Sequence, residues 1–116
     1  MTEPHPAGPR LLDRDHLGRY TGGDAALEAE LYGLLRGQIH STLDALGRTG
    51  GDEQLWRRLA HTLKGASRGV GAFALGEACA HAEDRPHDAA ALADIVSVSR
   101  ETLAAIDETL AALKAA

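Results

Sequence analysis

The chain has 116 residues, with 12 lysines and arginines against 17 aspartates and glutamates, for a formal net charge of −5. This length suits one domain of about 100–150 residues and is too short for a kinase or a two-domain dehydrogenase. The acidic balance argues against a nucleic-acid binder, and the single cysteine excludes a disulfide framework or a cysteine-based zinc site. No apolar run approaches the ~20 residues of a membrane span, so we expect a cytoplasmic protein.

Alanine and leucine dominate the composition, with 39 residues between them. Valine and isoleucine supply only six residues and the aromatic types only four. Helices favour alanine and leucine, whereas strands favour β-branched and aromatic residues. The composition therefore predicts an all-α domain.

The N-terminal part is expected to divide into a leader and a short helix. Residues 1–10 hold three of the four prolines and no periodic apolar pattern, which predicts a disordered leader before a folded domain over 11–116. The initiator methionine and this leader favour a free-standing protein over a piece of a hybrid kinase. A short helix is predicted over residues 11–19, and the Thr-Gly-Gly sequence at 21–23 ends it.

Two longer helices are predicted next. Asp24 suits an N-cap, and apolar residues then recur at spacings of three, four and one as far as Leu46, which is the stripe of an amphipathic helix. The glycine-rich residues 47–51 form a turn. Asp52 caps the following helix, which we expect to run to about Arg68.

Two further helices complete the predicted fold. One covers residues 72–84 and is stopped by Pro86, and Asp88 caps the last, whose near-heptad apolar stripe continues to the end of the chain. Short connections make consecutive helices antiparallel neighbours. The chain therefore predicts an antiparallel up-down four-helix bundle, with a short extra N-terminal helix closing one end.

The segment 55–70 carries a histidine on its polar face. At about 100° per residue, one face is apolar and formed by Leu55, Trp56, Leu59, Leu63, Ala66 and Val70. His61 points away from that face. The basic residues that lie within roughly 60° of it are Arg57, Arg58, Lys64 and Arg68.

A solvated face with a stray histidine would explain charges of this kind. However, the segment holds four cations and no acid in a chain of net charge −5, and the histidine sits at their centre. Gly65, one turn away, removes a side chain that would crowd the imidazole. These features favour an accessible histidine that meets an anionic partner.

Residues 60–83 resemble the histidine-containing phosphotransfer (HPt) domain family. The family pattern is a histidine, Leu-Lys-Gly after one residue, a glycine six residues on, and then three positions at four-residue steps. The matching residues are His61, Leu63, Lys64, Gly65, Gly71, Leu75, Cys79 and Glu83. Ala82 and Gly69 depart from the pattern, and both departures concern packing more than chemistry.

The resemblance implies a phosphocarrier without an ATP site. His61 would accept a phosphoryl group from the aspartate of one response-regulator receiver domain and pass it to another. Lys64 would offset the phosphoryl charge, with Arg68 as a second candidate. The receiver-docking face would comprise Arg57, Arg58, Gly65 and Arg68.

The same resemblance implies the cofactors and partners. The receiver would supply the aspartate and Mg²⁺, so we expect no cofactor and no metal on this chain. A histidine kinase or hybrid kinase would act upstream. The chain is expected to be a monomer that binds neither nucleic acid nor membranes.

The position of Glu83 follows from the expected hairpin. If residues 69–73 form the turn between two antiparallel helices, His61 and Glu83 each lie eleven residues from its midpoint near Ala72. A carboxylate at that level can accept a hydrogen bond from Nδ1–H and leave the Nε2 lone pair for phosphorus. A solvated surface glutamate is the alternative.

Other interpretations remain open at this point. A non-catalytic helical adaptor could bind a receiver without accepting phosphate, although the grouping of His61, Lys64 and Gly65 weighs against it. The dimerisation domain of a histidine kinase normally has an acid directly after its histidine, where this chain has Thr62. Glu77 and His81 share a helix face, but a metal site would need a second such pair. Cys79 is expected to be a buried small apolar residue.

Overall fold

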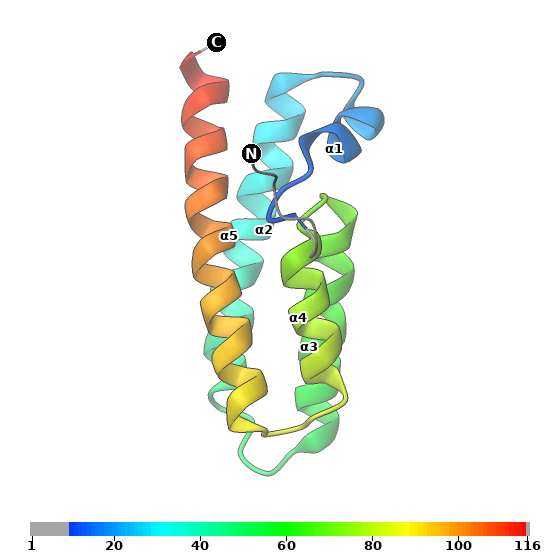
Figure 1. The fold of residues 1–116 in the computed structure, drawn as a ribbon, viewed down its shortest axis with the longest axis vertical. Coiled ribbons are helices and arrows are strands. Elements are labelled where there is room, and N and C mark those ends of the chain that lie inside the picture. The colour runs from blue at the N-terminus through cyan, green and yellow to red at the C-terminus, as the bar shows by residue number, and fades with distance from the viewer. Residues whose placement is uncertain (1–9, 116) are drawn as a thin grey trace, which may run out of the picture.

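The computed structural model describes residues 10–115 (Figure 1). Over this range the chain forms five α-helices and no strand, which confirms the all-α prediction. The helices are α1 (Arg14–Thr21), α2 (Ala25–Leu46), α3 (Glu53–Gly69), α4 (Phe73–Glu83) and α5 (Ala89–Ala115). None of them is both long and apolar enough to cross a membrane.

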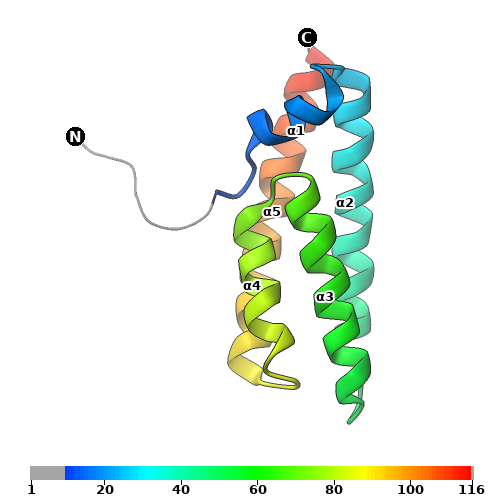
Figure 2. The same cartoon turned by 90° about the vertical axis from the view of Figure 1, so that its right-hand side faces the viewer.

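The four longer helices form the predicted up-down bundle. In Figures 1 and 2, α2 and α5 run the full length of the molecule, and the α3–α4 hairpin covers only part of that length. Helix α1 lies at the end where α2 begins and α5 ends. Among the helix pairs, α3 and α4 have the most extensive contacts, so the hairpin that carries His61 is the most closely packed pair.

Aspartates begin most of the helices, as the sequence indicates. The side chains of Asp24 and Asp52 accept hydrogen bonds from the third N–H of α2 and α3, at 3.1 and 2.9 Å. Asp88 accepts one from Ala91 N–H at 2.9 Å at the start of α5. Each such cap stabilises its helix by about 1 kcal/mol.

Helix α1 begins at Arg14, three residues later than the predicted Leu11. The preceding backbone is occupied elsewhere, because Asp13 N–H donates to the Gly71 carbonyl at 2.9 Å and the Arg10 carbonyl accepts from Ala74 N–H at 2.9 Å. The N-terminal segment therefore lies against the α3–α4 turn. The predicted leader lies outside the described residues except for Arg10.

The α3–α4 turn has a geometry that requires glycine. Gly71 has φ of +88°, and a Cβ atom there would lie 2.6 Å from the Asp13 carbonyl oxygen. The Ala72 N–H donates to the Ser67 carbonyl at 2.8 Å and closes the turn. A side chain at position 71 would be both strained and blocked, so this residue determines how α4 returns along α3.

The core consists mainly of aliphatic side chains and also contains Trp56 and Tyr32. Trp56 is buried, and its Nε1–H donates to the Ala82 carbonyl at 2.8 Å. This bond joins the N-terminal half of α3 to the last turn of α4 and satisfies both buried groups. It holds the two ends of the hairpin in register.

Candidate functional site

His61 projects from α3 away from the core, and 66% of its side-chain surface is exposed. The buried residues of α3 are Trp56, Ala60, Leu63 and Ser67. The core face is therefore rotated from the predicted one, because Leu55 and Leu59 are only partly buried. Ala60 and Ser67 are small, which allows α4 to approach α3 on that side.

The His61 ring is held from α4 by a carboxylate. His61 Nδ1 lies 3.0 Å from Glu83 Oε2, although the two residues are 22 positions apart. An ionised carboxylate has no proton to donate, so Nδ1 carries the hydrogen and the neutral ring has its lone pair on Nε2. No partner for Nε2 is found within residues 10–115. The register inferred from the turn brings these two side chains together.

Glu83 also binds Lys64 through its other oxygen. Lys64 Nζ donates to Glu83 Oε1 at 2.7 Å, and the two side chains are only 21% and 24% exposed. This hydrogen bond from the ammonium holds the pKa of Glu83 below its ordinary value; partial burial opposes the shift, and His61 reinforces it. Glu83 is therefore ionised at neutral pH. The sequence placed Lys64 near the histidine but did not indicate this bridge.

The other three cations on the His61 face have different environments. Arg57 is paired with Glu53, one turn earlier, at 3.7 Å. Arg58 and Arg68 are exposed, and no carboxylate within residues 10–115 forms an ion pair with either of them. Only these two retain an uncompensated charge for a partner.

Gly65 leaves the surface beside His61 open. A Cβ atom at this position would have no atom of the described chain within 4 Å, other than the helix's own backbone and adjacent residues. The backbone is ordinary helix, so conformation does not require glycine here. Only a side chain longer than alanine could cover the imidazole.

Within residues 10–115, the remaining candidates form no hydrogen bond or ion pair with His61, Lys64 or Glu83. Cys79 is buried, as expected, and burial raises the pKa of its thiol to about 12. Within the described residues, no three histidine, cysteine, aspartate or glutamate side chains gather as a metal site would require. His87 is exposed but its ring packs against Trp56, at 5.1 Å between ring centroids and an interplanar angle of 48°.

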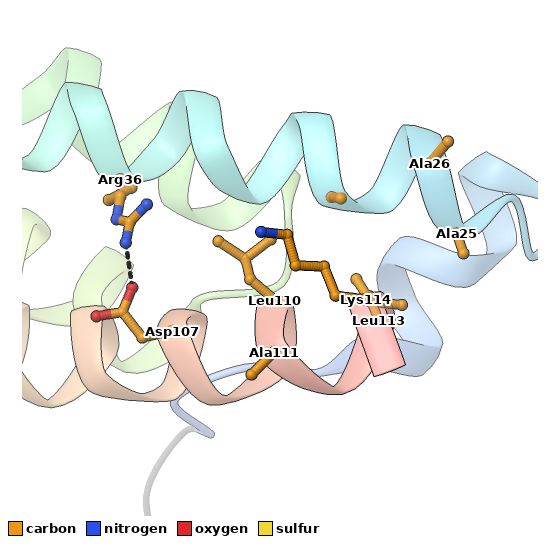
Figure 3. Close-up of a pocket in the computed structure, with 9 residues that line it drawn as sticks. Ala25, Ala26, Arg36, Asp107, Leu110, Ala111, Leu113 and Lys114 are labelled. Carbon is orange, nitrogen blue, oxygen red and sulfur yellow. Dashed lines mark hydrogen bonds and ion pairs between the residues drawn. The ribbon is translucent and has the colours of Figure 1, made fainter. Parts of the chain in front are cut away.

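A cavity of about 620 Å³ lies between the start of α2 and the end of α5. Figure 3 shows the Arg36–Asp107 ion pair, at 2.6 Å, at one end, and alanine and leucine side chains together with Lys114 line the rest. It shares no residue with the His61 site. The candidate site itself presents His61 on an exposed surface.

The α3–α4 hairpin thus presents an exposed, carboxylate-bound histidine beside uncompensated cations. The chain matches the family model of the Hpt domain over residues 25–116, which includes His61 and every residue around it. It belongs to the Hpt domain family. Domains of this family carry out histidine phosphotransfer in phosphorelays, with receiver domains and kinases as partners. No curated protein and no solved structure gave a significant match.

Proposed function

We propose that His61 accepts a phosphoryl group from the phosphoaspartate of a response-regulator receiver domain and transfers it to the aspartate of another. The observation that carries this assignment is the exposed imidazole, whose Nδ1 is bound to Glu83 and whose Nε2 has no partner within residues 10–115. Nε2 is therefore the nucleophilic nitrogen. The alternative is a helical adaptor that binds a receiver without accepting phosphate.

The transfer step balances with groups on the two proteins. The Nε2 lone pair attacks phosphorus, an N–P bond forms, and the P–O bond to the receiver's aspartate breaks, which releases a carboxylate. The ring gains positive charge in this step. Glu83 accepts the hydrogen bond from Nδ1–H, and its negative charge stabilises the positive charge of the ring. Attack by a second receiver's aspartate reverses these changes.

Lys64 acts in two ways. Its 2.7 Å bond to Glu83 fixes the carboxylate that orients His61, so it is first a positioning residue. Its ammonium also adds positive charge near the phosphoryl group, although it is shared with Glu83. The chain needs no cofactor of its own, since the receiver supplies the aspartate and the Mg²⁺.

The docking surface is proposed to surround His61 on α3. Arg57, Arg58 and Arg68 would meet the acidic phosphorylation site of the receiver, and Gly65 would leave room for it. A histidine kinase or hybrid kinase would supply the phosphoryl group through its receiver. We propose that the chain acts as a cytoplasmic monomer.

The test is phosphoryl transfer from a receiver domain labelled with radioactive acetyl phosphate. We expect label on the wild-type chain and none on His61→Gln, whereas His40→Gln, which removes another exposed histidine, transfers like the wild type. The labelled bond should be acid-labile and base-stable. Label on His61→Gln would refute the assignment. Binding of the receiver without any label on the wild type would favour the adaptor.

A further inference from the structure

The side chain of Arg68 lies across Gly76, on the neighbouring helix α4. A Cβ atom at Gly76 would lie 2.9 Å from Arg68 Cγ, 3.4 Å from Nε and 3.6 Å from Cδ. These three atoms follow one another along the arginine stem. The space that a side chain at position 76 would need is therefore filled by Arg68.

The two residues face each other in the register of the hairpin. Arg68 and Gly76 are each four residues from Ala72, just as His61 and Glu83 are each eleven residues from it. Arg68 also lies two turns from His61 on the same face of α3. The Arg68–Gly76 contact is thus a second cross-hairpin pair at the site, closer to the turn.

The backbone conformation does not explain why residue 76 is a glycine. Gly76 is the fourth residue of α4 and has no positive φ, and glycine is less favourable than alanine within a helix. The three nearest atoms to the Cβ position all belong to Arg68, and none belongs to the backbone of a packed helix. The arginine side chain is therefore the first group that a side chain at position 76 would meet.

Arg68 is held along its stem while its charged end stays uncompensated. No ion pair to its guanidinium is found within residues 10–115, in contrast to Arg57 and Lys64. The charge of the guanidinium opposes the rise that burial causes in the pKa of the Cys79 thiol, one turn along α4 from Gly76. A long side chain ordered before binding loses less conformational entropy when a partner contacts it.

We propose that Gly76 is a positioning residue that seats the Arg68 side chain across α4 as the pre-ordered cation for an acidic receiver surface. This inference rests on the proposed phosphotransfer function and adds a residue outside the motif to it. The Cβ atom of an alanine at position 76 would lie 2.9 Å from Arg68 Cγ and would force the arginine stem off α4. The freed arginine would keep its charge but lose its fixed position.

The test measures transfer from the labelled receiver over a range of receiver concentrations for Gly76→Ala, Arg68→Ala and the double variant. Each single change should raise the half-saturating receiver concentration about three- to tenfold. The double variant should show no more than the Arg68→Ala effect, because position 76 acts only through Arg68. The loss in Gly76→Ala should disappear when phosphoramidate, which needs no docking surface, replaces the receiver. Gly33→Ala and Arg100→Ala, at exposed positions on α2 and α5, are the matched controls.

The outcomes separate the two proposals. If neither the receiver nor phosphoramidate labels the wild type, the proposed function fails and this inference fails with it. If both label it but Gly76→Ala behaves like Gly33→Ala, or the effects of Gly76→Ala and Arg68→Ala simply add, only this inference is overturned. Should Gly76→Ala not fold, ¹⁵N relaxation of the arginine Nε atoms in the wild type decides. Arg68 should be more ordered than Arg58, and equal mobility would contradict the inference.

Discussion

Glu83 Oε2 lies 3.0 Å from His61 Nδ1, and this contact joins the last residue of α4 to the middle of α3. Its geometry depends on Gly71, which turns the chain at φ +88°, and on Trp56, whose Nε1–H bonds the Ala82 carbonyl next to Glu83. The site is therefore a property of the hairpin as a whole.

Removing the Glu83 carboxylate should release the His61 ring. In Glu83→Ala, Nδ1 loses its acceptor, so the neutral ring should become a mixture of tautomers and transfer should slow about three- to tenfold, as expected for the loss of one hydrogen bond. ¹⁵N NMR of the imidazole reports the tautomer directly. Glu77→Ala removes an exposed glutamate from the same helix and is the control. An unchanged tautomer in Glu83→Ala would show that Glu83 does not orient His61.

Lys64 should determine the titration of Glu83. Its ammonium is the main cause of the lowered pKa of Glu83, so Lys64→Met should raise that pKa, whereas Arg58→Met should leave it unchanged. ¹³C NMR of the carboxyl group measures this. A lowered native pKa stabilises the fold above the unfolded-state pKa, and that stability is lost as pH falls through the native pKa. The wild type should therefore be more stable than Lys64→Met, and this difference in stability should be larger near neutral pH than in acid. A pH-independent difference would contradict the ion pair.

Gly65 should matter for access to the imidazole and not for folding. Gly65→Ala should stabilise α3 by up to about 1 kcal/mol and still transfer, because the new Cβ has open space around it. Gly65→Gln should remain folded but should block transfer from a receiver. Thermal unfolding and the labelling assay measure the two effects, with Gly33→Gln as the control on α2. Wild-type transfer by Gly65→Gln would show that position 65 does not control access.

Charge reversal on the docking surface around His61 should slow docking more than the transfer step. Arg58→Glu removes an uncompensated cation, so association with a receiver should slow and lose part of its salt dependence, while the rate in the saturated complex stays nearly the same. Arg57→Glu should act in the same direction and would also place a carboxylate beside Glu53. Stopped-flow mixing at several salt concentrations separates the two rates, with Arg100→Glu as the control. Equal losses in the association rate and in the transfer rate of the saturated complex would contradict a role in docking.

The sequence by itself determined the helices and the face on which His61 lies. Apolar spacing and the aspartate caps at Asp24, Asp52 and Asp88 are local signals, since a helix depends on residues within one or two turns of each other. The level of Glu83 also followed from the sequence, because both helices of a hairpin rise equally per residue away from the turn.

Only the tertiary structure decided which side chains meet across the hairpin. Lys64 binds Glu83, Arg68 lies over Gly76, and the start of α1 moves to Arg14 because Asp13 N–H binds the Gly71 carbonyl. Helix periodicity gives each side chain an angle and a level, but the lateral offset and rotation of α4 against α3 depend on small buried residues such as Ala60 and Ser67. Several rotamers satisfy the same periodicity, and the packed neighbours select one of them.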